Sequence, residues 1–173
     1  MPLTRSLLAI CLVCSVLFFL NLQSRDFWAP DEGDFAQIAR ELSGNPVVPH
    51  LNGKPYGEKP PLYYWLTIPL YATPAARETI ARIGPAVCTL ITALAIFWLG
   101  TMFGNRRAGL LGGVILLTSL GFIGFGRSAS TDMPFTCCLT LAMAILAAAI
   151  ERDIGLKVLA AYVFLGLAIV GKG

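Results

Sequence analysis

The sequence predicts an all-α membrane protein, a polytopic transmembrane helical bundle that carries one long loop on its outer side. Three observations support this fold class. Hydrophobic residues make up 56% of the chain and charged residues only 13%, whereas soluble domains are about 25% charged. The mean hydropathy is +0.71. The apolar residues also gather in five long stretches, and most of the acidic residues lie between the first two stretches.

Five stretches are expected to cross the membrane, at about residues 7–22, 83–103, 108–126, 133–150 and 156–171. A hydrocarbon core about 30 Å thick requires about 17–25 apolar residues in a helix, so the middle three fit and the outer two are at the short limit. The first stretch could instead be a cleaved signal peptide, because Arg5 precedes a short apolar region. No small-residue cleavage site follows it, which favours a retained signal anchor.

The basic residues of the short loops predict the orientation of the bundle. They precede the first stretch or separate later ones, and they are Arg5, Arg106, Arg107, Arg152 and Lys157. The positive-inside rule places these loops and the N-terminus in the cytoplasm, and the loop 23–82 outside it. The basic residues form no continuous stripe, so nucleic acid is not an expected partner, whereas membrane lipids are.

The loop 23–82 is expected to be ordered, because it is rich in aromatic and aliphatic residues. Phe35, Ile38 and Leu42 repeat with helical spacing, which predicts a helix over about 31–42 that can lie on the membrane surface with its apolar face down. A second interfacial helix is expected at about 61–71. Asn52-Gly53, between the two helices, marks a turn.

Charged residues at three positions of the predicted outer face are candidates for function. Asp31 begins the first interfacial helix, Lys59 follows Glu58 just before the second, and Asp132 begins the fourth span. Each has a structural explanation, because either aspartate could cap its helix and the lysine could extend to the headgroups while it pairs with the glutamate. All of them nevertheless lie at one membrane surface, where ionisable groups are candidates for function.

Two small-residue patterns inside the spans are explained best by packing. Cys11-x-x-Cys14 lies in an apolar helix with no second cysteine pair nearby, so it is not expected to bind a metal. Two pairs of glycines have the small-xxx-small spacing that lets helices approach closely, namely Gly100 with Gly104 and Gly109 with Gly113.

Five short stretches resemble the GT-C fold glycosyltransferases, in the branch that contains the protein O-mannosyltransferases and the lipid A aminoarabinose transferases. They occur in the order expected for that branch, cover essentially the whole chain and lie on the expected membrane side. They are Pro30-Asp31-Glu32 with Phe35 and Ala36, Val48-Pro49-His50-Leu51, Tyr56-x-Glu58-Lys59-Pro60-Pro61, Thr131-Asp132-Met133-Pro134 and Gly171-Lys172-Gly173.

The resemblance implies a GT-C-like N-terminal half and the transfer of a sugar from a polyprenyl-phosphate carrier to a lipid or protein acceptor at the outer face of the inner (plasma) membrane. It implies that Asp31, as base or acceptor-positioning group, and Asp132 are catalytic, and that Lys59 holds the carrier phosphate. Tyr56 and Glu32 are expected to contact substrate. Glu58 matches a carboxylate of a divalent-metal site, completed either by His50 or by a residue outside this chain, and no other cofactor is implied.

The sequence departs from the family pattern in two residues and in length. Phe35 stands where many relatives carry tyrosine, and Gly57 replaces a bulkier residue. The chain is also much shorter than its relatives, so we expect it to be a fragment of a longer enzyme. The alternative functions are a non-catalytic polyprenyl-phosphate-binding membrane protein and a transporter fragment. A transporter is disfavoured because the predicted spans have essentially no ionisable residues between their ends.

The predicted orientation can be tested by cysteine labelling in intact cells. Glu58→Cys in the outer loop is expected to react with a membrane-impermeant maleimide, whereas Arg107→Cys in a cytoplasmic turn is expected to react only after the cells are permeabilised. The opposite labelling pattern would show that the predicted orientation is wrong.

Overall fold

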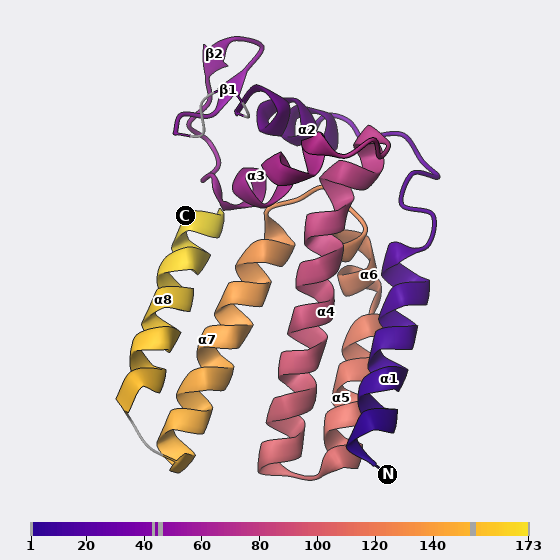
Figure 1. Ribbon diagram of the computed structural model, residues 1–173, viewed down its shortest axis with the longest axis vertical. Helices are drawn as coiled ribbons and strands as arrows, with labels where there is room; N and C mark the ends of the chain where they lie inside the picture. Colours follow the sequence, from indigo (N-terminus) through magenta and orange to yellow (C-terminus); the bar gives the residue numbers. More distant parts are fainter. Residues whose placement is uncertain (1, 43, 45–46, 153–154, 173) are drawn as a thin grey trace.

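Figure 1 shows the computed structural model of the chain, a bundle of helices with a smaller cap layer across one end. The structure describes residues 2–42, 44, 47–152 and 155–172, and for residues 151 and 152 it describes the backbone alone. The bundle contains α1 (Leu3–Cys14) with its π-helical continuation η1 (Ser15–Phe19), α4 (Arg77–Phe103), α5 (Arg106–Thr118), α6 (Leu120–Gly126), α7 (Asp132–Arg152) and α8 (Gly155–Lys172). The cap contains α2 (Asp31–Leu42), the strands β1 (His50–Leu51) and β2 (Lys54–Pro55), α3 (Leu62–Thr67) and the 3-10 helix η2 (Ile68–Ala72).

The helices of the bundle confirm the all-α membrane fold class. Three of the described helices are long and apolar enough to cross a membrane: α4, the Asp132–Ile150 part of α7, and α8. Helices α5 and α6 would make a fourth span if they act as one, and α1 with η1 forms a shorter apolar helix, Leu3–Phe19. The chain is therefore an integral membrane protein, whereas the set of five crossings stays a prediction.

Helix α4 begins earlier than the expected span. It starts at Arg77 and runs for 27 residues, which is about 40 Å at 1.5 Å per residue. This length exceeds a hydrocarbon core of about 30 Å, so the first turns of α4 extend into the cap. Arg82, expected at the end of the outer loop, lies inside the helix and is fully buried.

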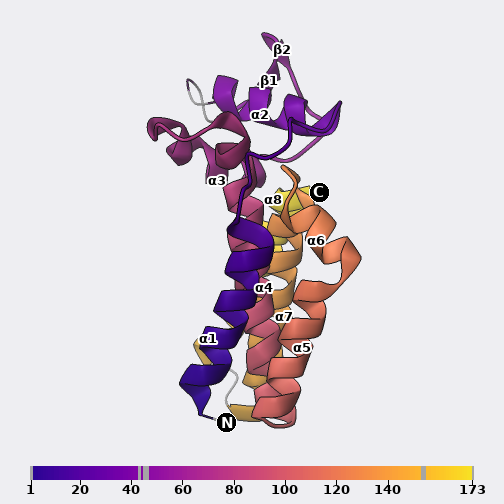
Figure 2. The same ribbon diagram turned by 90° about the vertical axis from the view of Figure 1, so that its right-hand side faces the viewer.

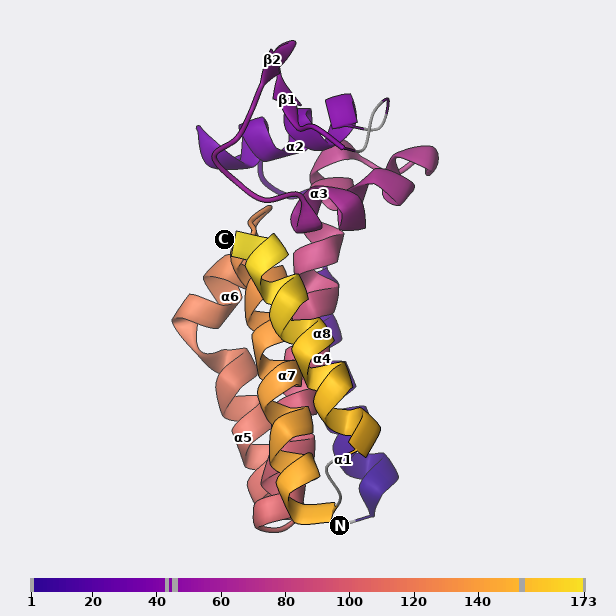
Figure 3. The same ribbon diagram turned by 90° about the vertical axis from the view of Figure 1, so that its left-hand side faces the viewer.

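The third expected span is bent rather than straight. Helices α5 and α6 meet at an angle of 67°, and Figures 2 and 3 show α6 stepping out of the line of α5 near the cap. Ser119, between the two helices, has extended backbone angles (φ −72°, ψ 136°). Its hydroxyl and its N–H group both donate to the Leu116 carbonyl, at 2.8 Å and 3.2 Å, and they close the last turn of α5 before the bend.

The apolar stripe of α2 is covered by protein. Phe35, Ile38 and Leu42 are buried in one cluster with Tyr63 and Tyr64 of α3. The sequence analysis allowed this helix to rest its apolar face on the membrane, but the aromatic residues of α3 bury that face instead. Residues 61–71, expected as one helix, divide into α3 and η2, and a proline stands in the first turn of η2.

The tyrosines of α3 and η2 fasten the cap together. The Tyr63 hydroxyl donates to the Ala81 carbonyl of α4 at 2.9 Å, and the Tyr71 hydroxyl donates to the Ala36 carbonyl of α2 at 2.7 Å. These bonds fix α2 and α3 over the end of α4.

The strands β1 and β2 form a small hairpin on α2. Asn52 and Gly53 have φ angles of 54° and 76°, as a type I′ hairpin turn requires, so the turn predicted there is confirmed. The Glu41 carboxylate of α2 accepts the N–H groups of Asn52 at 2.9 Å and of Gly53 at 3.1 Å. Ser43-Gly44-Asn45-Pro46 predicts the end of helix α2, but Ser43, Asn45 and Pro46 lie outside the described residues.

Glycines bring α4 and α5 into close contact. A Cβ atom added to Gly100 would lie 2.6 Å from the Gly109 Cα atom, so a larger residue fits only if the two helices separate. This contact agrees with the packing role expected from the glycine spacing.

We predict that Gly100→Ala destabilises the protein by about 1–3 kcal/mol, because the added methyl group overpacks a close backbone contact. Gly166→Ala in α8 is the matched control, because nothing lies within 4 Å of a Cβ atom there and alanine favours a helix by about 1 kcal/mol over glycine. Thermal unfolding in detergent measures both variants. Equal stability of the two would contradict the close contact.

Candidate functional site at the junction of cap and bundle

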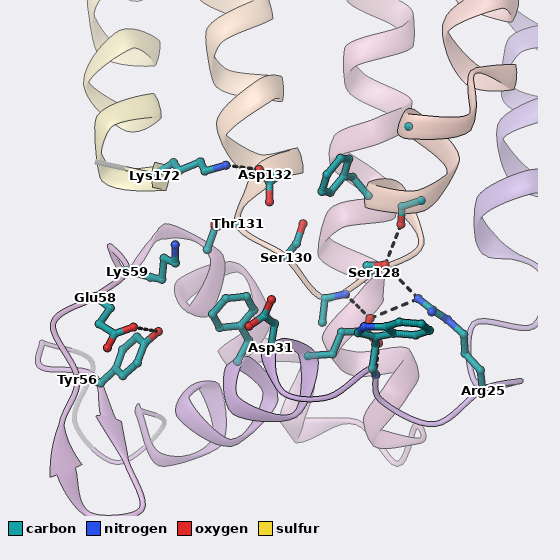
Figure 4. A pocket seen from close by; sticks show the side chains of 17 residues that line it. Arg25, Asp31, Tyr56, Glu58, Lys59, Ser128, Ser130, Thr131, Asp132 and Lys172 are labelled. Carbon is teal, nitrogen blue, oxygen red and sulfur yellow. Dashed lines mark hydrogen bonds and ion pairs between the residues drawn. The ribbon is translucent and has the colours of Figure 1, made fainter.

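A cavity of about 590 Å³ lies where the cap meets the bundle (Figure 4). This volume lies within the range of about 300–1,000 Å³ that is common for ligand pockets. Its wall comes from the segment before α2, α2 itself, the chain between β2 and α3, helix α6, the loop before α7 and the end of α8. The lining residues are Arg25, Trp28, Asp31, Glu32, Phe35, Tyr56, Glu58, Lys59, Gly121, Gly124, Phe125, Ser128, Ala129, Ser130, Thr131, Asp132 and Lys172.

The cavity brings together all six residues for which the sequence analysis expected a role. They come from three separate stretches of the chain and are Asp31, Glu32, Tyr56, Glu58, Lys59 and Asp132. His50, considered as a metal ligand, does not line the cavity, and its Nδ1 atom lies 2.8 Å from the Val48 carbonyl oxygen.

The Asp31 carboxylate is free to act on a ligand. Asp31 is exposed at the first turn of α2, and with the described residues its carboxylate forms neither a hydrogen bond nor an ion pair. The capping explanation would require it to accept an N–H group of its own helix, and no such bond is present there. Lys59, half-buried on another wall of the same cavity, likewise has no ion-pair partner within the described part of the chain.

Glu32, the neighbour of Asp31, is instead fully engaged. It is only 2% exposed, and its Oε1 accepts the Arg82 Nε–H at 3.1 Å and the Ala129 N–H at 2.7 Å. Its Oε2 accepts the Arg82 Nη2–H and the Trp28 N–H, both at 2.8 Å. A direct contact with substrate, the role expected from the sequence, would require one of these bonds to break.

Arg82 is the partner that the sequence analysis missed. Besides its two bonds to Glu32, its Nη1 donates to the carbonyls of Leu22 at 2.7 Å and Arg25 at 2.9 Å. Its Nη2 also donates to the Asp26 carbonyl at 3.0 Å. All five N–H groups of the guanidinium are therefore used, and they join α4 to α2 and to the chain that enters the cap.

The charge state of Glu32 follows from these contacts. Burial by itself raises the pKa of this carboxyl, but hydrogen bonds from Arg82 and from the N–H groups of Trp28 and Ala129 favour the carboxylate. The net effect is a pKa below the ordinary value. Glu32 is thus charged at neutral pH, and it balances the buried Arg82.

Asp132 is paired across the bundle. It stands at the start of α7 and forms an ion pair with Lys172 at the end of α8, and Figure 4 shows the two side chains pointing toward each other. Lys172 lies forty positions further along the chain, and in the sequence it was noted only as part of the Gly171-Lys172-Gly173 stretch. Gly173 lies outside the described residues.

Tyr56 contributes a neutral hydrogen-bond donor to the wall. Its hydroxyl donates to Glu58 Oε2 at 3.4 Å. Burial and, second, the nearby Glu58 carboxylate raise the pKa of this phenol above its ordinary value. The hydroxyl therefore stays protonated at neutral pH.

Comparisons with known proteins identify the family of this chain. The family model described as dolichyl-phosphate-mannose-protein mannosyltransferase matches residues 3–173. The chain belongs to this family. This match confirms the resemblance to the GT-C glycosyltransferases found in the sequence.

Several undecaprenyl phosphate-alpha-4-amino-4-deoxy-L-arabinose arabinosyl transferases are similar to this family member. The protein from Pectobacterium atrosepticum is 33% identical over 162 residues, which cover 92% of this chain and 29% of that protein. The protein from Erwinia tasmaniensis is 32% identical over 171 residues, which cover 97% of this chain and 31% of that protein. The chain thus spans about a third of the length of these relatives.

Solved structures of ArnT from Cupriavidus metallidurans have the same fold as this family member. The crystal structure bound to undecaprenyl phosphate matches with a TM-score of 0.90 and 25% identity, over 99% of this chain and 33% of that one. The apo structure matches with a TM-score of 0.86, over 98% of this chain and 33% of that one.

The side chains described for this family member do not form a metal site. A divalent metal requires several oxygen or nitrogen ligands around one point, and the described residues contain no group of three or more His, Cys, Asp or Glu side chains placed to hold a metal ion. Glu58 is held by Tyr56, and His50 lies outside the cavity.

We predict that Glu32→Gln destabilises the protein by about 3–5 kcal/mol, because it leaves the buried Arg82 charge uncompensated. Since the folded-state pKa of Glu32 lies below the ordinary value of about 4.3, the contribution of the pair is complete above that value and is lost as the pH falls through the lower, folded-state pKa. Thermal unfolding in detergent across this pH range should therefore show a difference between wild type and variant that shrinks in acid.

Glu78→Gln is the matched control for this change. Glu78 lies in the first turn of α4, close to Arg82 along the chain, and it forms no ion pair with the described residues. Its substitution should change stability by less than about 1 kcal/mol. A similar loss of stability in both variants would contradict the predicted contribution of the ion pair between Glu32 and Arg82.

Proposed function

We propose that the complete protein is a membrane glycosyltransferase that moves a sugar from a polyprenyl-phosphate carrier to a lipid or protein acceptor. We further propose that the cap faces away from the cytoplasm, at the outer face of the inner membrane. In support of this orientation, Arg106 and Arg107 in the α4–α5 turn and Lys157 at the start of α8 lie at the end of the bundle opposite the cap (Figure 1).

One observation carries the proposal. A single cavity at the end of a transmembrane bundle holds a carboxylate, Asp31, and an ammonium group, Lys59, and neither forms an ion pair with the described residues. These are the two groups that transfer from a phosphate ester requires: a base for the acceptor and a cation for the leaving group. Gly121, Gly124 and Phe125 form an apolar part of the lining of the same cavity, where a carrier that is partly lipid can be accommodated.

The geometry supports a direct assignment of the two roles. The acceptor hydroxyl attacks the anomeric carbon of the sugar, and the bond from that carbon to the phosphate oxygen breaks. The Asp31 carboxylate accepts the hydroxyl proton as the new bond forms, and the carrier phosphate leaves with the bonding electrons. Lys59 stabilises the negative charge that develops on this phosphate as a point charge.

The donor is proposed from the relatives. The similar transferases are named for undecaprenyl phosphate-alpha-4-amino-4-deoxy-L-arabinose, and one ArnT crystal structure has undecaprenyl phosphate bound. The shared fold and the free Lys59 ammonium support the same class of carrier for this protein.

The remaining expected residues have supporting parts in this proposal. Asp132 remains a second catalytic candidate, and its ion pair with Lys172 must loosen if it is to exchange a proton. Tyr56 can donate a hydrogen bond to substrate, and Glu32 fixes the position of Asp31. A divalent metal at Glu58 would require ligands beyond the described residues, and no step of the proposed transfer passes through it.

Asp31→Asn and Lys59→Ala in the full-length protein should separate chemistry from binding. The first is expected to lower kcat by about 10²–10⁴-fold, because it removes the base, while undecaprenyl phosphate binding stays near that of the wild type. The second is expected to weaken undecaprenyl phosphate binding by about 10–100-fold, because it removes a charge-assisted contact. Transfer from undecaprenyl phosphate-aminoarabinose and equilibrium binding of the bare carrier measure the two effects.

Two matched controls keep the charge change but lie outside the cavity. Asp34→Asn alters the same turn of α2, and Lys54→Ala alters the exposed hairpin, and neither residue lines the cavity. Full sugar transfer by Asp31→Asn would refute the role of Asp31 as the base. If the wild type binds the carrier but transfers no sugar, the protein is a binding protein instead. Unchanged carrier binding by Lys59→Ala would remove the phosphate contact.

A further inference from the structure

One buried polar group in the cavity has no partner. The Ser130 side chain is 9% exposed, and its hydroxyl finds no hydrogen-bond partner within the described part of the chain. Buried hydroxyl groups are nearly always hydrogen-bonded, because leaving one unpaired is unfavourable. Two other buried hydroxyls share this condition, those of Ser6 and Tyr64, but neither residue lines the cavity.

The position of Ser130 is fixed relative to Asp31. Glu32, next to Asp31, accepts the N–H group of Ala129, next to Ser130, at 2.7 Å. This bond joins the first turn of α2 to the loop before α7, so the Asp31 and Ser130 residues that line the cavity are held close to each other. In the view of Figure 4, Ser130 lies between Asp31 and Asp132, while Lys59 lies to one side.

The surroundings of Ser130 favour a neutral ligand group over a phosphate. The cavity wall around Ser130 carries the carboxylates of Asp31 and Asp132, and among the described residues only the second is neutralised by an ion pair. A phosphate would be repelled there and is better placed at Lys59. A sugar hydroxyl, by contrast, can both donate to and accept from the serine hydroxyl.

The proposed transfer places the sugar in the same region. The anomeric carbon is bonded to the phosphate at Lys59 and is attacked by an acceptor whose proton goes to Asp31. The sugar ring must therefore lie between these two side chains, where the loop of Ser130 forms the wall.

We propose that Ser130 is a sugar-positioning residue. Its hydroxyl oxygen is closed to solvent in this structure, and rotation about the Cα–Cβ bond turns the hydroxyl toward the cavity, where it forms a hydrogen bond with a hydroxyl group of the transferred pyranose. This inference rests on the proposed function and deepens it, because it names the part of the donor that the loop before α7 recognises. Ser130 does not take part in the bond changes. It orients the ring so that the anomeric carbon faces the acceptor.

The test compares two lipids with the full-length protein in detergent: undecaprenyl phosphate, and undecaprenyl phosphate-alpha-4-amino-4-deoxy-L-arabinose. The wild type is expected to bind the sugar-bearing lipid more tightly. Ser130→Ala is expected to lose about fivefold to tenfold in affinity for that lipid, as for one buried hydrogen bond, and to bind the bare carrier as the wild type does.

Ser6→Ala is the matched control, because it removes the other buried, unpaired serine hydroxyl, in α1, away from the cavity. It should bind both lipids as the wild type does. Three results would overturn the inference: an unchanged affinity of Ser130→Ala for the sugar-bearing lipid, an equal loss for both lipids, or a wild type without preference for the sugar. Failure of the wild type to bind either lipid would refute the proposed function itself.

Discussion

The buried ion pair of Arg82 and Glu32 is the interaction on which the site depends. Arg82, near the start of α4, donates three hydrogen bonds to carbonyls of the chain that enters the cap and two to Glu32. Glu32 in turn accepts the N–H group of Ala129, in the loop before α7. A buried pair of charges is favourable only when its remaining donors and acceptors are satisfied, and here they are. The pair therefore sets where the first turn of α2 lies relative to two helices of the bundle.

Two adjacent acidic residues, Asp31 and Glu32, consequently differ in role. Glu32 is buried, charged and fully bonded, while Asp31 beside it is exposed and unbonded. Successive residues of a helix point in directions about 100° apart, so a helix held firmly by one acid presents the next to the cavity. Glu32 also holds the loop before α7 in place, because it accepts the N–H group of Ala129. Asp31 and Asp132 are thus carried by helix ends that these contacts hold in place.

Local patterns in the sequence predicted a large part of this structure. The periodicity of Phe35, Ile38 and Leu42 indicated α2, Asn52-Gly53 indicated the hairpin turn, and six short-motif residues proved to share one cavity. What the sequence could not show are pairings between distant residues. Arg82 lies fifty positions from Glu32 and Lys172 forty from Asp132, and no periodicity relates them. The burial of α2 by Tyr63 and Tyr64 and the bend at Ser119 likewise depend on tertiary contacts, which local propensity does not encode.

The means by which the cap is attached also has a biochemical consequence. Residues 23–82 contain no cysteine, and the five cysteines of the chain are free thiols that lie in α1, α4 and α7. Apolar packing, hydrogen bonds and the ion pairs of Glu32 hold the described part of the cap, so its assembly requires no thiol oxidation. The arrangement of the cap is consequently independent of the redox poise of the compartment that it faces, and reducing agents leave it intact.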